Sequence, residues 1–269
     1  MRYLSLLTLL VLVALPTRAQ DRVITDDEWC DDDNWNRDTE KYCEVREYNL
    51  AADRNVVVVD GGQNGGIKVT GWDRDEILVR AKVTGSARSE EQARELADKV
   101  TVDTGRTIEA NVPRRTSNWG RKTWVSVSFQ VFVPHNSNLD LETFNGGLSI
   151  ADVSGDVTFD VLNGGVSLYN LAGDVEGSTT NGGLNVELTG SEWDGEGLNV
   201  KTTNGGVSLK VPEDYSADLE VATVNGGLRF DFPVTLQGKV GRKLSLALGD
   251  GGSPVRVRTT NGSVKVRRS

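Results

Sequence analysis

The chain has 269 residues, of which 37% are hydrophobic and 26% are charged, and its formal net charge is −9. These proportions are typical of a folded soluble protein, and they exclude a disordered chain or an integral membrane protein. One histidine and two cysteines are too few for a histidine-rich metal site or a four-cysteine zinc site, so we expect no metal or other cofactor.

Residues 1–19 have the features of a secretory signal peptide. Arg2 supplies a positive charge, an apolar run covers residues 4–15, and Pro16 ends that run. Ala19 is a small residue of the kind that signal peptidase prefers, so we expect cleavage after it and export to the periplasm or the cell exterior. The apolar run is too short to cross a bilayer, and we expect no membrane span after cleavage.

The next segment, residues 20–44, is acidic and contains both cysteines. An exported protein meets an oxidising environment, so Cys30 and Cys43 are expected to form a disulfide with twelve residues between them. The acidic loop could be a calcium loop or a solvated cap. The spacing does not fit an EF-hand, because Trp35 and Arg37 stand where ligands or the turn glycine belong. We therefore favour the cap, and the cation question stays open.

We assign residues 45–269 to one β-strand-repeat domain. Its first part has strand patterns between residues 53 and 83 and a clean alternating strand over residues 125–133. A single short helix is predicted over residues 89–100. Ser89 is a suitable N-cap, acidic residues fill the first turn, and the apolar residues form one stripe.

An Asn-Gly-Gly motif recurs through the second half of the chain. The segments read TFNGGLSI, VLNGGVSL, TTNGGLNV, TTNGGVSL, TVNGGLRF and TTNGSVKV. Their asparagines are Asn145, Asn163, Asn181, Asn204, Asn225 and Asn261. The steps between them are 18, 18, 23, 21 and 36 residues, and GDGGSPV inside the last step is interpreted as a degenerate copy. QNGGIKV at residues 63–69 is an outlying copy upstream.

The residues around each motif alternate between apolar and polar, which predicts strands with one buried and one wet face. The buried set changes parity across each Asn-Gly-Gly, so a tight turn is expected there. We expect the glycines to supply the positive φ that such a turn needs.

Two all-β architectures satisfy this pattern. Each motif is either the loop of a hairpin in an antiparallel β meander, or one corner of a β-solenoid whose equivalent residues stack from coil to coil. We favour the solenoid, because only stacked turns require the turn residues to be alike. The six asparagines then form a ladder of amide hydrogen bonds.

These motifs, together with VSVSFQVFVPHNSNLDLETFNGGLSI and the CEVREY leader, resemble the bacterial toast-rack, or adhesin-like, family of unknown function. The resemblance covers roughly residues 43–269. It implies an exported β-strand-repeat protein of the cell envelope, adhesin-like or linked with envelope stress. The family brings no catalytic residues with it.

Charge is unevenly distributed along the chain. Residues 20–53 carry a net charge of −8 and residues 239–269 one of +7. A solenoid would place these two segments at opposite ends, so we expect a basic end. We expect its outward side chains to bind anionic envelope glycan, lipid headgroups or another envelope protein, but not nucleic acid. The candidate anion-binding residues are Arg256, Arg258, Lys265, Arg267 and Arg268.

The sequence thus favours a non-enzymatic, exported envelope module with an adhesive or structural role. The alternative is a polysaccharide-active β-helix enzyme. Such an enzyme needs an outward cluster of ionisable residues in a groove with an aromatic neighbour such as Trp193. Across the coils the outward residues vary without pattern, and we expect no catalytic, cofactor-binding or metal site.

Overall fold

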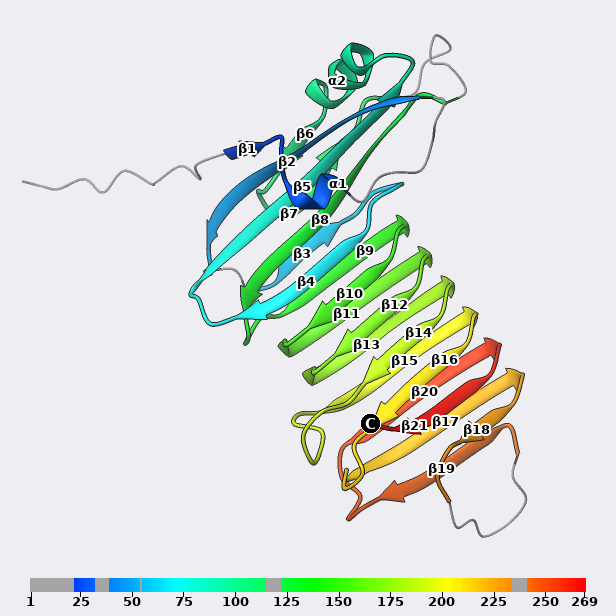
Figure 1. The fold of residues 1–269 in the computed structure, drawn as a ribbon. Coiled ribbons are helices and arrows are strands. Elements are labelled where there is room, and N and C mark those ends of the chain that lie inside the picture. The colour runs from blue at the N-terminus through cyan, green and yellow to red at the C-terminus, as the bar shows by residue number, and fades with distance from the viewer. Residues whose placement is uncertain (1–21, 32–38, 54, 115–121, 234–240) are drawn as a thin grey trace, which may run out of the picture.

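Through the Asn-Gly-Gly repeats, successive strands alternate between two facing β-sheets, so this part of the chain winds into a flattened solenoid (Figure 1). The computed structural model describes residues 22–31, 39–53, 55–114, 122–233 and 241–269. The expected signal peptide, residues 1–19, lies outside this part, and so do Asp32, Asp33 and Asp38 of the acidic loop.

Sheet A contains, in spatial order, the following strands: β1 (Arg22–Ile24), β2 (Glu40–Ala51), β5 (Glu76–Ala87), β8 (Trp124–Pro134), β4 (Ile67–Trp72), β10 (Leu148–Ala151), β12 (Val166–Tyr169), β14 (Leu184–Glu187), β16 (Val207–Val211), β21 (Val264–Arg268) and β18 (Leu228–Phe230). Sheet B contains β19 (Lys243–Leu248), β17 (Ala217–Asn225), β20 (Pro254–Asn261), β15 (Gly197–Asn204), β13 (Ala172–Asn181), β11 (Ser154–Asn163), β9 (Leu139–Asn145), β3 (Val57–Asp60), β7 (Thr107–Asn111) and β6 (Thr101–Asp103).

The repeats form parallel ladders, which confirms the solenoid and excludes the antiparallel meander for this region. In sheet B, β9, β11, β13 and β15 pair in parallel, and Asn145, Asn163, Asn181 and Asn204 stand opposite one another. The strands that follow each turn pair in the same way in sheet A. One coil therefore consists of one strand from each sheet. The QNGGIKV copy forms the first coil, since β3 pairs with β9 and β4 pairs with β10.

The order of the last coils differs from the expected one. β20 pairs with both β15 and β17, and β21 pairs with both β16 and β18. The final coil of the sequence is thus inserted between the two that precede it, and the C-terminus lies among the coils (Figure 1). Residues 249–253 do not form a degenerate coil. They join β20 to β19, which pairs antiparallel with the outer edge of β17.

The glycines of the motif are needed for close stacking and not for positive φ. None of them has a positive φ. A Cβ at Gly164 would lie 1.9 Å from the carbonyl oxygen of Gly146, and one at Gly205 would lie 2.0 Å from that of Gly182. The second glycine has more space, with the nearest atom 3.7 Å from a Cβ at Gly165, and Ser263 takes this place in the last motif. The expectation of a left-handed turn was wrong because backbone proximity between coils sets the requirement.

Apolar side chains of both sheets fill the interior, and five threonines join them two residues before the asparagine. Each hydroxyl donates to a motif glycine carbonyl of the adjacent coil over 2.6–2.8 Å. The threonines are Thr143, Thr179, Thr202, Thr223 and Thr259. Their hydrogen bonds satisfy polar groups that burial would otherwise penalise.

The N-terminal part extends sheet A with the antiparallel strands β1, β2, β5 and β8. The predicted helix is α2 (Glu90–Asp98), and Ser89 caps it by accepting a hydrogen bond from the Gln92 amide. The expectation of a single helix was wrong. A second one, α1 (Glu28–Asp31), begins where the Asp27 carboxylate accepts from the Trp29 amide. β2 runs continuously across residues 44 and 45, where we placed a domain boundary.

Candidate functional site

The five candidate anion-binding residues lie on the inserted coil and not at an end of the solenoid. Arg256 and Arg258 point outward from β20 on sheet B, whereas Lys265 and Arg267 point outward from β21 on sheet A. The two sheets face each other, so the predicted single cluster is divided between opposite faces. These residues are close together in the sequence but not in space.

On sheet B, Arg258 is engaged by a neighbouring carboxylate. Its Nη2 and Nε donate to Oε1 of Glu220 over 2.6 and 3.1 Å, and Lys243 lies 3.1 Å from the other oxygen. The hydrogen bond from Arg258, together with Lys243, lowers the pKa of Glu220 against the opposing effect of burial. Arg258 therefore has a stabilising role within the protein.

Arg268 is also occupied by the fold. Its Nη1 donates to the carbonyl of Pro212, and its guanidinium lies 4.3 Å from the ring centre of Phe232. Its backbone amide donates to Asp231. These contacts attach the end of β21 to its neighbours. Arg268 therefore has a structural role and is not available to bind a ligand.

On sheet A, the exposed cations Lys265 and Arg229 have no counter-charge among the described residues. Lys265 of β21 stands opposite Arg229 of β18 in the parallel register. Within the described part of the chain, neither side chain makes an ion pair or a hydrogen bond. Like charges on neighbouring strands repel each other, so an anion between them would be stabilised. Sequence analysis missed Arg229, because its partner strand is known only once the order of the coils is known.

These cations border a shallow groove of about 450 Å³. Its lining residues are Asn185, Gly206, Val207, Ser208, Arg229, Ser263 and Lys265. The side chains near the two cations are small or polar, so the groove offers hydroxyl and amide groups beside positive charge. We call this groove, with Arg267 beside it, the basic groove.

A straight row of short polar side chains leads along sheet A to the basic groove. Ser149, Ser167, Asn185 and Ser208 occupy equivalent outward positions on neighbouring parallel strands. Parallel strands are about 4.8 Å apart, so such groups recur at regular intervals along the solenoid axis. Tyr169 stands beside this row, and 46% of its surface is exposed. The row is uncharged, whereas the groove at its end is positive.

The six motif asparagines form one continuous amide ladder. Each Nδ2 donates to the Oδ1 of the neighbouring asparagine over 2.7–2.8 Å, except that of Asn145, which donates to the Gln63 carbonyl over 2.8 Å. The spatial order is Asn145, Asn163, Asn181, Asn204, Asn261 and Asn225. The amides bind one another, which is a structural role and not a ligand-binding one.

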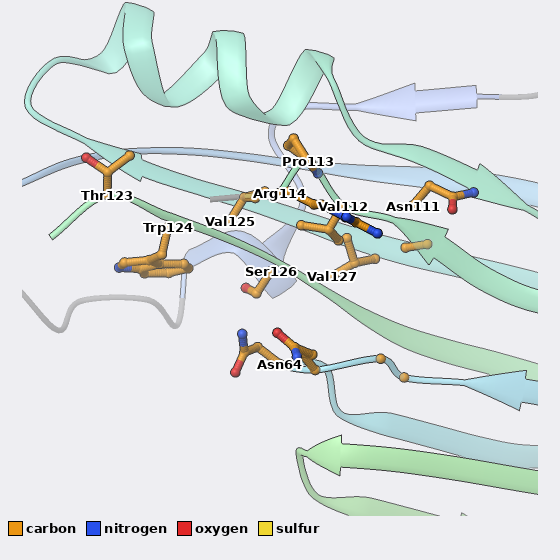
Figure 2. Close-up of a pocket in the computed structure, with 14 residues that line it drawn as sticks. Asn64, Asn111, Val112, Pro113, Arg114, Thr123, Trp124, Val125, Ser126 and Val127 are labelled. Carbon is orange, nitrogen blue, oxygen red and sulfur yellow. The ribbon is translucent and has the colours of Figure 1, made fainter. Parts of the chain in front are cut away.

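A cavity of about 670 Å³ lies where the first coil meets the N-terminal strands (Figure 2). Asn64 comes from the first turn, Asn111 ends β7, Arg114 follows that strand, and Trp124 begins β8. The lining is mixed, with an aromatic ring, amides and one cation.

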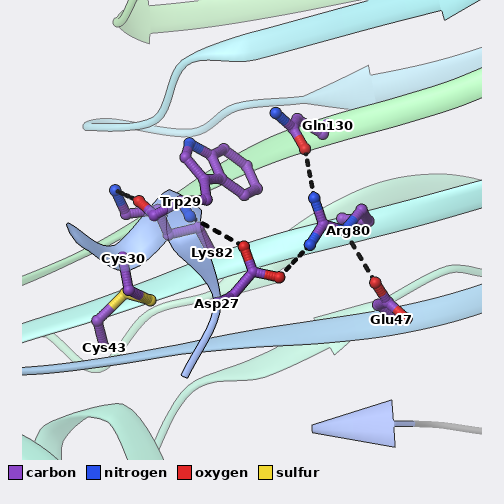
Figure 3. A network of polar contacts seen from close by, with 8 residues as sticks. All are labelled: Asp27, Trp29, Cys30, Cys43, Glu47, Arg80, Lys82 and Gln130. Carbon is purple, nitrogen blue, oxygen red and sulfur yellow. Dashed lines mark hydrogen bonds and ion pairs between the residues drawn. A yellow bond between two sulfur atoms is a disulfide. The ribbon is translucent and has the colours of Figure 1, made fainter. Parts of the chain in front are cut away.

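Within the acidic N-terminal segment, Asp27 packs onto sheet A (Figure 3), whereas Asp26, Glu28 and Asp31 are exposed to solvent. Arg80 of β5 pairs with Asp27 and with Glu47, and its Nη1 donates to Gln130. Lys82 donates to the Trp29 carbonyl over 2.6 Å. The Cys30–Cys43 disulfide, present as expected, ties α1 to β2. The interpretation as a solvated cap was wrong at Asp27, because two cations on β5 attract this segment to the sheet.

The groove required by the enzyme alternative is present only in part. Sheet B has a cavity of about 370 Å³ whose lining includes Asp140, Glu142, Asp160 and Lys201. Trp193, the expected aromatic neighbour, is instead buried, and its Nε1 donates to the Gly173 carbonyl over 3.0 Å. Trp193 therefore has a structural role at the edge of a coil.

Among the described residues, no group of three or more His, Cys, Asp and Glu side chains could hold a metal ion. Within the same residues, no helix has both the length and the apolar character needed to cross a membrane.

Residues 135–267 match the family model described as Toastrack DUF4097. This match covers the repeats from β9 to β21 and confirms the resemblance inferred from the Asn-Gly-Gly motifs. No curated protein sequence matches the chain.

Three solved structures resemble this one at low sequence identity. A candidate cell adhesion protein of Clostridium sporogenes is 10% identical, with 86% of this chain and 100% of that one covered and a TM-score of 0.43. A candidate adhesin of Bacteroides fragilis is 11% identical, with 86% and 98% covered and a TM-score of 0.31. A candidate lipid binding protein of Parabacteroides distasonis is 13% identical, with 87% and 98% covered and a TM-score of 0.32. Similarity at this level carries no argument about function.

Proposed function

We propose, from the premise that residues 135–267 form a toast-rack domain, that this protein is a non-enzymatic, exported binding module of the cell envelope. Its ligand is an anionic glycan that lies along the outer face of sheet A. The protein acts by holding this polymer, in the manner of an adhesin. The export step rests on the signal-peptide features of residues 1–19.

The pair formed by Lys265 and Arg229 carries the proposal. Two exposed cations stand in register on adjacent strands, and no described carboxylate neutralises them. Arg267 adds a third positive charge on the same face. A carboxylate, sulfate or phosphate group bound here would offset their mutual repulsion. At physiological ionic strength, salt screens the attraction between these charges and an anion beyond about 8 Å, so the ligand must approach closely to be recognised.

The polar row supports a polymer, and not a small anion, as the ligand. Ser149, Ser167, Asn185 and Ser208 present hydroxyl and amide groups in a straight line that ends at the basic groove. These groups are suited to hydrogen bonding with sugar hydroxyls. The exposed ring of Tyr169 offers an apolar surface beside them, on which a sugar ring can pack.

The test measures binding of the purified protein to alginate, a linear acidic polysaccharide, with neutral dextran as the comparison. We expect alginate binding that weakens steeply as sodium chloride rises, and no dextran binding. Replacing Arg229, Lys265 and Arg267 by serine should weaken alginate binding at least tenfold. The matched control replaces three exposed cations of the N-terminal region, Arg88, Lys99 and Arg106, and should bind like the wild type.

Equal binding of alginate by the wild type and the sheet A variant would overturn the proposal, as would equal binding of dextran. Binding to vesicles with anionic lipid but not to alginate would replace the glycan by a membrane surface. Tyr169→Ala separates the contribution of ring packing from that of the positive charges. It should weaken alginate binding without changing its dependence on salt, because it removes packing and not charge.

A further inference from the structure

The outer face of sheet B changes sign from acidic to basic when its strands are taken in spatial order. One row of outward side chains reads Glu142, Asp160, Ser178, Lys201 and Arg258 on successive strands. In sequence order Ala222 of β17 stands between Lys201 and Arg258. The insertion of β20 next to β15 places the two cations side by side.

The neighbouring row, two residues earlier on each strand, follows the same order. It reads Asp140, Thr158, Glu176, Asn199 and Arg256. On β9 both rows have a carboxylate and on β20 both have a guanidinium, and beyond these strands the rows continue to Asp60 on β3 and to Ala222 and Glu220 on β17. Apart from Glu220, which is paired with Arg258 and Lys243, the face has an acidic side and a basic side, and the strand between them is β13.

β13 is also the central strand of this face. The parallel strands run in the order β3, β9, β11, β13, β15, β20 and β17, with three on each side of β13. If a twofold axis along β13 relates two copies, the strands of the second copy lie opposite those of the first in reverse order. Each row of side chains then faces the same row of the second copy. Asp160 would then face Lys201 of the second copy, and Glu142 would face Arg258 of the second copy. In the other row, Asp140 would face Arg256 of the second copy.

We propose that the outer face of sheet B is a self-complementary docking surface on which a second copy of this chain binds through a twofold axis along β13. The three facing pairs unite opposite charges, and symmetry produces each pair twice. Charge complementarity of this kind determines orientation and register more than bulk affinity. A twofold interface is closed, so the product is a dimer and not a filament.

The side chains needed for this contact are accessible. Asp140, Glu142, Asp160 and Lys201 are exposed, and Arg256 and Arg258 are half-buried. Adjacent carboxylates on neighbouring strands repel one another in the monomer, as do adjacent cations, and docking relieves both repulsions. Arg258 keeps its hydrogen bond to Glu220 of its own copy. In the dimer it would therefore contact carboxylates of both copies.

The size of the face suits a stable dimer. With strands about 4.8 Å apart and about 3.3 Å per residue, seven strands of roughly eight residues cover about 750–900 Å² of each copy. A standard specific interface buries about 800 Å² per partner. Glu176 lies on the proposed axis and would face its own counterpart, although Asn199 donates a hydrogen bond to its Oε1. This one like-charge contact is outweighed by three pairs of opposite charge on each side.

The experiment combines sedimentation velocity with charge reversal, using the purified protein at low ionic strength. The wild type should dimerise, and dissociation should increase with sodium chloride. Lys201→Glu and Asp160→Lys should each weaken dimerisation at least tenfold. The double variant, Asp160→Lys with Lys201→Glu, should recover dimerisation to within about threefold of the wild type, because the two sites face each other across the axis.

The control is Lys265→Glu, which changes the charge by the same amount on the opposite face and should leave dimerisation unchanged. Circular dichroism melts establish that every variant is folded. A wild type that stays monomeric at 100 μM in low salt would overturn the proposal. A double variant that remains monomeric would overturn the twofold register, and species larger than dimers would overturn the closed symmetry. The glycan proposal concerns sheet A, so the two proposals succeed or fail separately.

Discussion

Asn261 donates its side-chain amide to Oδ1 of Asn204 over 2.7 Å, although the next motif asparagine after Asn204 in the sequence is Asn225. Asn225 in turn donates to Oδ1 of Asn261. The last coil of the chain is therefore held on both sides by coils that precede it. This arrangement places the C-terminal strands in the interior of the stack. They are thereby held in place, whereas most chain ends fray.

Hydrogen exchange should detect this insertion. The amides of Val264 and Val266 in β21 should exchange as slowly as those of Val207 and Leu209 in β16, because β21 has a strand on each side. β18, which lies at the edge of sheet A, should exchange faster than β21. Rapid exchange throughout β21 would show that the C-terminal coil is at the end of the solenoid.

The two glycines of one motif should respond differently to substitution. A Cβ at Gly182 would lie 1.9 Å from the carbonyl oxygen of Gly164, whereas one at Gly183 would lie 3.4 Å from its nearest neighbour. We expect Gly182→Ala to destabilise the protein by about 2 kcal/mol or more, since the coils must separate to accept it. Gly183→Ser should cost less than about 0.5 kcal/mol. Chemical denaturation measures both, and equal losses would contradict the stacking explanation.

The amide ladder predicts that an interior asparagine contributes more than a terminal one. Asn181 donates to Asn163 and accepts from Asn204, whereas Asn225 makes only the bond to Asn261 within the ladder. Asn181→Leu should therefore destabilise by roughly 1 kcal/mol and Asn225→Leu by about half as much, since exposed amides can still bond to water. Thermal melts of the two variants provide the comparison, and an unchanged melt for Asn181→Leu would show that the ladder contributes no stability.

Glu220 should make part of the stability depend on pH. The hydrogen bond from Arg258 and the proximity of Lys243 lower its pKa below 4.5 in the folded protein. Its contribution is therefore complete above pH 4.5, the value for the unfolded chain, and is lost as pH falls through the folded value. Glu220→Gln should cost about 0.5–1 kcal/mol at pH 7, because both cations are partly exposed.

The measurement is denaturation of wild type and Glu220→Gln across a pH series. The difference between them should stay constant from pH 7 to about pH 5 and shrink at lower pH. A difference that persists unchanged at pH 2 would assign the effect of the substitution to packing and not to the ion pair.

The disulfide should stabilise the attachment of the N-terminal segment to β5. Closing a loop of this length contributes about 3 kcal/mol in the chain-entropy model. Replacing Cys30 and Cys43 together by serine should lower stability by roughly that amount and increase hydrogen exchange in residues 22–31. The ion pair between Arg80 and Asp27 should weaken in parallel, because it depends on the same segment. Two titratable thiols in the native, air-exposed protein would contradict the bridge itself.

Much of the fold follows from local pattern. The alternation of apolar and polar residues predicts strands, and the likeness of the turns predicts stacked coils, because only stacking makes each turn the neighbour of the next. Ser89 and the stripe after it predict α2 nearly to its ends. The inward threonines are also identifiable, since the alternation places Thr179 and Thr202 on the buried side.

Less of the candidate site could be predicted from the sequence. The spacing along the chain grouped Arg256, Arg258, Lys265 and Arg267 into one basic end, yet the strands alternate between the two sheets and divide these residues between opposite faces. Arg229, which completes the basic groove, drew no attention, because its neighbour Lys265 lies 36 residues further along the chain.

The sequence by itself therefore determined which residues are buried and which are exposed within each coil, because that choice depends on local alternation. Only the tertiary structure decided the order in which the coils stack. Every coil presents the same asparagine, glycine and threonine surfaces to its neighbours, so these contacts do not specify which coil binds which. The order, and with it the charge pattern of both outer faces, depends on the pairing of β20 with β15 and β17 and on the pairing of β19 with β17. These are long-range contacts that no local periodicity encodes.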